Sequence, residues 1–365
     1  MGSFKSFIGF VCAAFFVLGL AASLQSQQVH KGYMNYSEKE LIKIWKEWKK
    51  KLPVSEEAIE LEMVKSFPTE EDESNGVYFW GPMGIEGLPN GNIIVNDQKV
   101  KQIFMFDERG SFIKKIGRAG QGPGEFGNPF CMTTTSDSII VADNSNMRIQ
   151  YYDLEGNFIR DFKIFKALID ISVNTEGLIY AAPLRINPEY SLVDVLDKNG
   201  KLLTSFGKAR FGEKSTSFIS NRVKISMNNK NDLYLAFNSF PLVCRYTADG
   251  NLQTEFKLDH KVLKELEKEN QTQLKNKGNL KNVIYSIGTG INGFFILFWY
   301  PRTQILEYDY DGSLVNEYYF KDETYDTLFW DFVIQENGEE KIFYLLKKAP
   351  EKKIVILRSK KISSD

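Results

Sequence analysis

The chain has 365 residues, with 46 Lys or Arg against 47 Asp or Glu, so its formal net charge at pH 7 is −1. This balance gives no general attraction to nucleic acid, whose binding depends on the neutralisation of phosphates by basic residues. Two histidines, His30 and His260, are too few for a multi-histidine zinc site and argue against a Ser-His-Asp triad.

The first 24 residues have the profile of a signal peptide. Lys5 precedes an apolar run that extends from Phe7 to Leu24, and a polar segment begins at Gln25. This run is also close to the shortest length that spans a bilayer, so an uncleaved signal anchor is the alternative. In both cases we expect the rest of the chain to be extracytoplasmic, either periplasmic or secreted, and membrane-anchored if the signal is not cleaved.

Residues 25–54 predict a linker followed by an amphipathic helix over 37–52. Ser37 and Glu40 have the spacing of a capping box, and Pro53 marks the end of the helix. The apolar face consists of Leu41, Ile44, Trp45, Trp48 and Leu52. We expect this helix to dock on the domain that follows. Its Trp and Lys content makes contact with a membrane surface or a partner the alternative.

Residues 55–360 repeat one pattern of strands. Six short apolar segments recur, at 92–97, 138–143, 177–182, 232–237, 293–298 and 341–346. Five of them continue through a second strand into a turn of the form Asp/Thr-x-x-Gly, at 107–110, 153–156, 197–200, 247–250 and 309–312. Asp accepts hydrogen bonds from turn amides, and Gly at the fourth position adopts positive φ without strain. With a strand before each apolar segment and another after each turn, the pattern predicts four strands per unit, which is typical of a propeller blade.

The fold class that follows is all-β, a six-bladed β-propeller of four-stranded antiparallel blades. The sixth unit lacks its outer strand, and the segment from Ala58 to Phe67 has no unit of its own. We therefore expect this N-terminal strand to complete the last blade, because an open ring would expose a long apolar edge. Residues 259–279 form an insertion that predicts a helix capped by Asp259, and residues 361–365 form a tail. The helix is expected either to belong to the binding face or to act only as a lid over apolar surface. The residues expected to pack inward from this helix are Val262, Leu263 and Leu266.

Two segments of the second unit resemble the NHL-repeat family of six-bladed propellers. Asp143, Asn146 and Arg148 match that family's Asp-x-x-Asn-x-Arg core, and residues 117–129 resemble its Gly-rich loop between blades, which ends in Phe-x-x-Pro. The other units keep only the strands and turns; Asp97 matches in the first. The resemblance implies a degenerate propeller of the exported bacterial type, a group whose members have no assigned activity.

The loops after the apolar segments predict a ligand face at one end of the propeller. The candidate ligand-binding residues on them are Asp97, Asp143, Asn146, Arg148, Arg185, Tyr190, Trp299, Tyr300 and Arg302. We interpret the pair of Asp143 and Arg148 as a brace across its loop rather than as a site. Arg185, Trp299 and Arg302 place guanidinium and aromatic groups on loops, which suits planar anions, carbohydrates or protein side chains. Solvent-exposed packing is the alternative for these three.

The sequence contains no catalytic constellation, so we predict a non-catalytic binding scaffold that holds a protein, peptide or glycan on the loop face. No cofactor and no nucleic-acid partner are expected; membrane contact is predicted only through an uncleaved segment 7–24 or the helix at 37–52. The alternative is an enzyme, such as a calcium-dependent lactonase-like hydrolase or another propeller lyase. Calcium needs only oxygen ligands, which Asp97 and Asp143 can supply.

Overall fold

The computed structural model describes residues 38–184, 191–212, 220–276, 280–299, 302–321, 327–338 and 340–359. They belong to two compact units, Met1–Pro53 and Val54–Asp365. The first contains the predicted helix as α2 (Glu38–Lys51), while the predicted signal segment 1–24 and tail 361–365 lie outside the described residues. Among the described helices, none is both long enough and apolar enough to cross a membrane. The docking of α2 stays a prediction.

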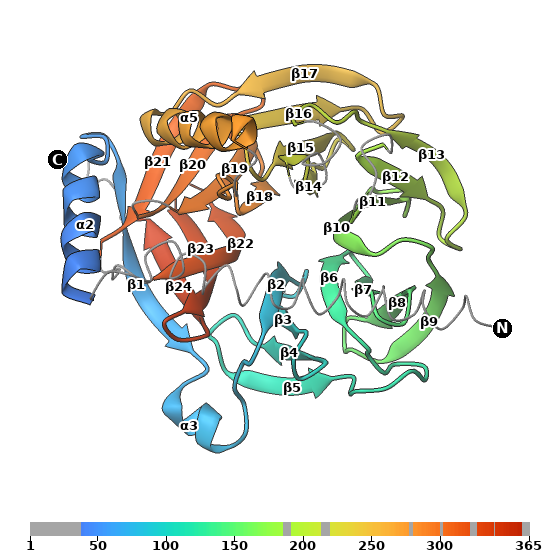
Figure 1. The fold of residues 1–365 in the computed structure, drawn as a ribbon. Helices are drawn as coiled ribbons and strands as arrows, with labels where there is room; N and C mark the ends of the chain where they lie inside the picture. Colours follow the sequence, from blue (N-terminus) through green and yellow to red (C-terminus); the bar gives the residue numbers. More distant parts are fainter. Residues whose placement is uncertain are drawn as a thin grey trace. The chain divides into compact units, whose positions relative to one another are not determined.

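The second unit is a β-propeller, with sheets arranged around a central channel (Figure 1). Within the described residues, four sheets have four antiparallel strands each, in chain order from the channel outward. The strands of these sheets are β2 (Pro82–Gly87), β3 (Ile93–Asp97), β4 (Gln102–Phe106) and β5 (Phe112–Ile116); β6 (Pro129–Thr134), β7 (Ser138–Asp143), β8 (Arg148–Asp153) and β9 (Phe158–Lys163); β10 (Leu168–Val173), β11 (Ile179–Pro183), β12 (Val193–Leu196) and β13 (Leu202–Phe206); and β14 (Val223–Met227), β15 (Leu233–Phe237), β16 (Leu242–Tyr246) and β17 (Leu252–Lys257).

The remaining strands form one eight-stranded sheet. Their order across it is β18 (Ser286–Thr289), β19 (Gly293–Trp299), β20 (Thr303–Asp309), β21 (Leu314–Phe320), β1 (Ile59–Phe67), β24 (Lys353–Ser359), β23 (Glu340–Ala349) and β22 (Leu328–Asn337). β1 runs antiparallel to β24, with Met63 opposite Leu357 and Phe67 opposite Ile354. The N-terminal strand therefore lies beside the C-terminal strand, as the sequence predicted. A short parallel pairing of β1 with β21, in which Ile59 lies opposite Tyr318, was not predicted and joins the two halves of the sheet.

The Asp/Thr-x-x-Gly turns have the predicted local structure. Their glycines adopt φ between +76° and +90°. In the first turn, the Asp107 carboxylate accepts hydrogen bonds from the backbone amides of Arg109 and Ser111 at 3.0 and 2.7 Å. The same side-chain acceptor occurs at Asp153, Asp197, Thr247 and Asp309.

Each turn glycine also packs against the outer strand of the preceding blade. An added Cβ would overlap Ile116 at Gly156, Phe162 at Gly200, Phe206 at Gly250 and Phe256 at Gly312. At Gly110, in the first blade, the side chain in this position is Phe67 of β1. Phe67 thus packs against the first blade as an outer-strand residue of the preceding blade does at the other turns. This packing agrees with the pairing of β1 and β24, and both place β1 at the closure of the ring.

The helices of the second unit lie in its connections. α3 (Glu70–Ser74) follows β1, and α5 (Lys261–Lys275) lies between β17 and β18 within the predicted insertion. Val262, Leu263 and Leu266 are buried, which confirms the predicted inner face. The predicted cap was wrong by one residue: His260 is the N-cap and makes no side-chain capping bond, whereas Asp259 forms an ion pair with Lys264 at 2.5 Å.

The closure predicts the effect of Phe67→Ala. The Phe67 side chain is fully buried and its ring centroid lies 4.9 Å from that of Phe106, so truncation leaves a cavity between the last and first blades. We expect the free energy of unfolding to fall by about 3–5 kcal/mol in urea titrations. Met63→Ala on the same strand is the control, because Met63 is 52% exposed, and its cost should stay near 0.5 kcal/mol or less. Equal effects of the two substitutions would contradict the closure.

Candidate ligand site in the central channel

Asp97, a predicted ligand contact, is buried and its carboxylate is occupied by the fold. It accepts hydrogen bonds from the backbone amides of Trp80, Gly81 and Lys99 at 2.7–2.9 Å. These bonds tie the loop that enters β2 to the end of β3. Asp97 therefore acts as a brace within the first blade.

Asp143 has the same role in the second blade. Its carboxylate accepts hydrogen bonds from the backbone amides of Gly127 and Asn128 at 2.7–3.1 Å and from the Asn146 side chain at 2.7 Å. The Nε atom of Arg148 lies 3.5 Å from the same carboxylate. Asp143 and Arg148 thus have the bracing geometry that the sequence suggested for them.

The Arg148 guanidinium holds the Gly-rich loop of residues 117–124. It donates hydrogen bonds to the carbonyls of Gly122 and Glu125 at 2.8 Å, and it pairs with Asp161 at 2.9 Å. Because the guanidinium is buried among these partners, it faces the protein rather than solvent.

Five predicted residues remain, of which the structure describes Trp299 and Arg302. Trp299 and Arg302 flank the connection from β19 to β20, and both are buried, Trp299 within the core of the eight-stranded sheet. The alternative of solvent-exposed packing therefore does not hold for these two side chains. Arg185, Tyr190 and Tyr300 lie outside the described residues. A ligand role for any of these residues stays a prediction.

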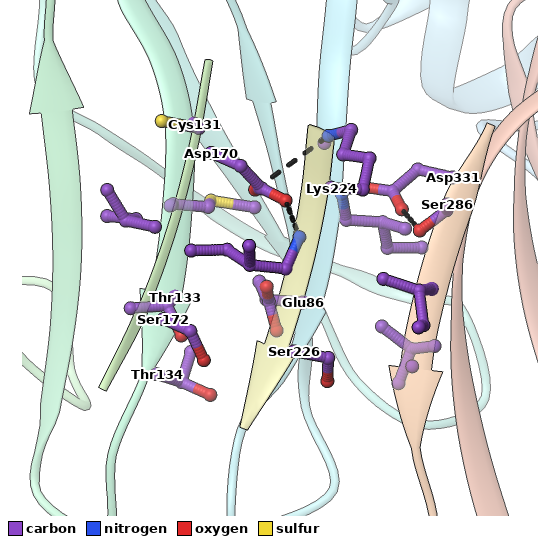
Figure 2. Close-up of a pocket in the computed structure, with 18 of the residues that line it drawn as sticks. Glu86, Cys131, Thr133, Thr134, Asp170, Ser172, Lys224, Ser226, Ser286 and Asp331 are labelled. Atoms are coloured by element: carbon purple, nitrogen blue, oxygen red, sulfur yellow. Dashed lines mark hydrogen bonds and ion pairs between the residues drawn. The ribbon is translucent and has the colours of Figure 1, made fainter. Parts of the chain in front are cut away.

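A cavity of about 260 Å³ lies on the axis of the propeller and was not foreseen from the sequence. The innermost strand of every blade lines it, and each strand contributes a triplet with an apolar centre. The triplets are Gly84-Ile-Glu86, Cys131-Met-Thr133, Asp170-Ile-Ser172, Lys224-Ile-Ser226, Ser286-Ile-Gly288 and Asp331-Phe-Val333. The central residues are buried, and alternation along a strand brings the flanking residues to the channel in two tiers (Figure 2).

The tiers are ordered along the channel by strand register. The first residues of two triplets show the direction: Asp170 lies opposite Ala182 on β11, and Lys224 lies opposite Ala236 on β15. Each of these alanines is the last but one residue of its strand, so the first residue of the triplet lies near the end at which that strand leaves the sheet. The first residues form the upper tier, nearer the loop face. The third residues, with Glu86 among them, form the lower tier. The signal for the tiers in the sequence is a period-two alternation around a central Ile, Met or Phe, which by itself marks a strand with one face away from the core.

Two upper-tier acids bind the neighbouring blade. Backbone amides on the channel side of the inner strands have no neighbouring strand to pair with. Such amides need another hydrogen-bond acceptor. Asp170 accepts a hydrogen bond from the Ile225 amide at 2.9 Å, and Asp331 accepts one from the Ile85 amide at 3.2 Å. Asp331 also accepts the Ser286 hydroxyl at 2.5 Å. The acids therefore connect adjacent blades around the channel.

The charges in the channel perturb one another. The Lys224 ammonium lies 3.8 Å from the Asp170 carboxylate. Burial raises the pKa of Asp170 to about 6, despite the opposing effect of Lys224. Burial lowers the pKa of Lys224, but the charges of Asp170 and Asp331 outweigh that effect and leave this pKa above its usual value. For Glu86, burial and then the charges of Asp331 and Asp170 raise the pKa well above its usual range.

Lys348, on β23, lies at the upper rim of the channel. Its Nζ atom lies 3.9 Å from the ring centroid of Trp330 and 3.4 Å from the Met83 sulfur. Burial, followed by repulsion from Lys224, lowers the pKa of Lys348 to about 7. The amine therefore changes its charge near neutral pH, and a bound anion would favour its protonated form.

The described residues contain no group of three or more His, Cys, Asp or Glu side chains placed to hold a metal ion. Cys131 is buried, and burial raises the pKa of its thiol, so the thiol stays protonated and weakly nucleophilic at neutral pH.

Comparison with known proteins places the chain among propellers. The family described as a domain of unknown function (DUF4934) matches residues 87–288, more than half of the chain. The crystal structure of a Bacteroides fragilis protein that carries the name of an exported protein covers 85% of this chain and 98% of its own, with a TM-score of 0.57 and 13% identity. At that identity, the likeness shows the fold alone.

Two further matches are weaker or shorter. Protein brain tumor of Drosophila melanogaster, an NHL-like homologue, is 28% identical over 134 residues, which are 35% of this chain; the match spans only 12% of that protein's length. Virginiamycin B lyase of Staphylococcus aureus covers 81% of this chain and 99% of its own, at 14% identity and a TM-score of 0.49. The latter likeness is too low to support an argument about activity.

The raised pKa of Asp170 predicts a pH-dependent difference between the wild type and Asp170→Asn. Between pH 4 and 6 the folded protein binds more protons at Asp170 than the unfolded chain, whose Asp titrates near 3.8. The contribution of Asp170 to stability is therefore fully present below pH 4 and is lost as the pH rises through 6. We expect the free energy of unfolding of the wild type minus that of Asp170→Asn to fall by about 1–3 kcal/mol between pH 4 and pH 7, as measured by urea titrations.

Asp153→Asn is the control for this measurement. Hydrogen bonds from Asn157 lower the pKa of Asp153, so its contribution to stability is already present above the pH at which an unfolded Asp titrates, and the corresponding difference should stay nearly constant from pH 5 to 7. A difference for Asp170→Asn that is constant from pH 4 to 7 would show that Asp170 titrates normally.

Proposed function

We propose that this chain, which belongs to the DUF4934 family of domains of unknown function, is an extracytoplasmic, non-catalytic binding protein whose ligand occupies the loop-face end of the central channel. The ligand is a protein, a peptide or a glycan. The observation that carries the proposal is the polar channel itself: the ionisable Glu86 and Lys224 line the cavity in place of apolar packing, and Lys348 contacts Met83 of its lining.

The proposal treats the eight-stranded sheet as two blades, which makes the propeller six-bladed. β18–β21 would form the fifth blade, and β22–β24 with β1 the sixth. The supporting feature is that β22 and β18 both line the channel, as do β2, β6, β10 and β14. Six inner strands then surround the cavity, one from each blade.

The energetics of burial favour a binding role. Removing charged groups from water costs free energy unless they are paired or hydrogen-bonded. Asp170 and Asp331 have structural partners in neighbouring strands. Within the described residues, the Glu86 carboxyl makes no hydrogen bond, and the pKa of Lys348 is depressed. Stability alone does not account for these two groups, whereas complementary charges on a ligand would.

Exposed aromatic residues support a ligand that extends beyond the channel. Trp80 precedes β2 and is 63% exposed, and Phe165 precedes β10 and is 91% exposed. Both lie in loops that lead into inner strands, on the same side of the sheets as the upper tier. Exposed Trp and Phe side chains are typical anchors for protein or peptide partners and stack on sugar rings.

The cellular location in this proposal rests on the signal-peptide profile of residues 1–24. The similar structure from Bacteroides fragilis carries the name of an exported protein, which agrees with it. Contact with a membrane through residues 7–24 or through α2 is part of the same proposal.

The proposal predicts channel-dependent binding. We would measure the melting temperature of the purified full chain in the presence of each member of a panel of short peptides and oligosaccharides. The Kd of each compound that raises the melting temperature would then be determined. Lys348→Met should weaken binding at least tenfold, because it removes the rim charge and keeps a side chain of similar length. Lys230→Met, which changes an exposed lysine in a turn, should bind as the wild type does.

Three outcomes would count against the proposal. No compound in either panel binds; the compounds bind Lys348→Met as tightly as the wild type; or calcium alone stabilises the protein and supports hydrolysis of a lactone, which would favour the enzyme alternative.

A further inference from the structure

We propose that the central channel binds a short peptide in its zwitterionic form, with the peptide ammonium group at Glu86 and its carboxylate at Lys348. This inference rests on the proposed binding function and adds the chemical class of the ligand. It follows from the order of charges along the channel, from the polar groups that lack protein partners, and from the size of the cavity.

The charges follow one another along the channel axis. Lys348 lies two residues beyond Leu346, and Leu346 pairs with Asp331 of the upper tier, so Lys348 lies above that tier. Its contact with Met83, the residue before Gly84 of the upper tier, agrees with this position. Glu86 follows Gly84 by two residues on β2 and therefore lies in the lower tier. A cationic rim therefore lies above an acidic floor.

The floor offers partners for an ammonium group. Within the part of the chain that the structure describes, neither the Glu86 carboxyl nor the Thr133 hydroxyl makes a hydrogen bond, although Thr133 is only 9% exposed. Both residues line the cavity, from adjacent blades (Figure 2). An ammonium group carries three donors and would satisfy both acceptors.

The groups that face Glu86 determine how it titrates. They are Asp331 on β22, Asp170 on β10, Lys224 on β14 and Cys131 on β6. Burial and the two aspartates keep a proton on Glu86 well above its usual pKa. A bound ammonium favours the ionised carboxylate, so ligand binding below neutral pH releases protons from Glu86.

The rim offers a partner for a carboxylate. Lys348 contacts Trp330 and Met83, and burial lowers the pKa of its amine. An arriving carboxylate would restore its protonation and form a charge-assisted hydrogen bond. Lys224 is less suited to this task, because Asp170 already pairs with it.

The dimensions select a short peptide. The backbone of Lys348 lies about four strand residues above that of Glu86, which corresponds to roughly 13 Å along the channel. Because both side chains are long, the distance between their charged ends is shorter than this. An extended peptide of two or three residues spans about 7–10 Å, which fits this gap. The cavity of about 260 Å³ lies below the usual 300–1,000 Å³ of pockets for drug-sized ligands.

The experiment compares dialanine with its two blocked forms, N-acetyl-dialanine and dialanine amide. Isothermal titration calorimetry on the full chain, at pH 6 in two buffers of different ionisation enthalpy, gives both Kd and the number of protons released. We expect dialanine to bind at least tenfold more tightly than either blocked form and to release protons on binding.

Two variants locate the ammonium site. Glu86→Gln should weaken dialanine binding at least tenfold and abolish the proton release, and it should fold because Glu86 makes no hydrogen bond within the described residues. Glu155→Gln, an exposed turn residue, is the matched control and should bind as the wild type does. Circular dichroism melting of each variant separates a loss of binding from a loss of folding. If Glu86→Gln does not fold, Thr133→Val, which removes the second acceptor, should weaken dialanine by at least threefold.

The outcomes distinguish this inference from the proposed function. If dialanine and its blocked forms bind equally, or if none binds while another peptide or a glycan binds in a Lys348-dependent manner, the zwitterion assignment is wrong and the binding function stands. If no compound binds the channel, both are wrong. Dialanine binding that Glu86→Gln leaves unchanged would place the ammonium group elsewhere and overturn the assignment.

Discussion

The antiparallel pairing of β1 with β24 is the interaction on which the rest of the structure depends. It joins residues separated by almost the whole second unit. It also places Phe67 against Gly110 of the first blade, in the position that an outer-strand side chain takes at the four other turn glycines. Without it, β24 would be an open edge, and the bond from the Ile85 amide to Asp331 would be left to link the first and last inner strands, β2 and β22. The closed ring is therefore what forms the channel and its opposed charges.

The channel shows how one set of side chains serves both structure and recognition. Inner strands have no neighbour on the channel side, so Asp170 and Asp331 supply the acceptors that their amides need. Burial raises the pKa of Glu86, and the charges of these two acids raise it further, whereas burial and then the charge of Lys224 lower the pKa of Lys348. The groups that fasten the blades thus also generate the electrostatic field that a ligand would meet.

Much of the fold could be predicted because its sequence signals are either local or follow from the number of strands in each repeat. The Asp107 turn follows from side-chain chemistry within four residues, and the role of β1 follows from one missing strand. The parallel contact of β1 with β21 has no local signal. Asp97 and Asp143 were correctly placed at strand ends, but their bonds to Gly81 and Gly127 depend on how the inter-blade loops fold back. The channel charges were missed because alternation in a strand does not tell a channel from bulk solvent.

Hydrogen–deuterium exchange of the segments 59–67 and 353–359 tests the closure most directly. The account predicts that amides of both segments exchange slowly and together, at the rate of global unfolding, because each strand protects the other and both border the core. Rapid exchange in residues 59–67, with 353–359 protected as an edge strand only, would contradict the closed ring and the channel built upon it.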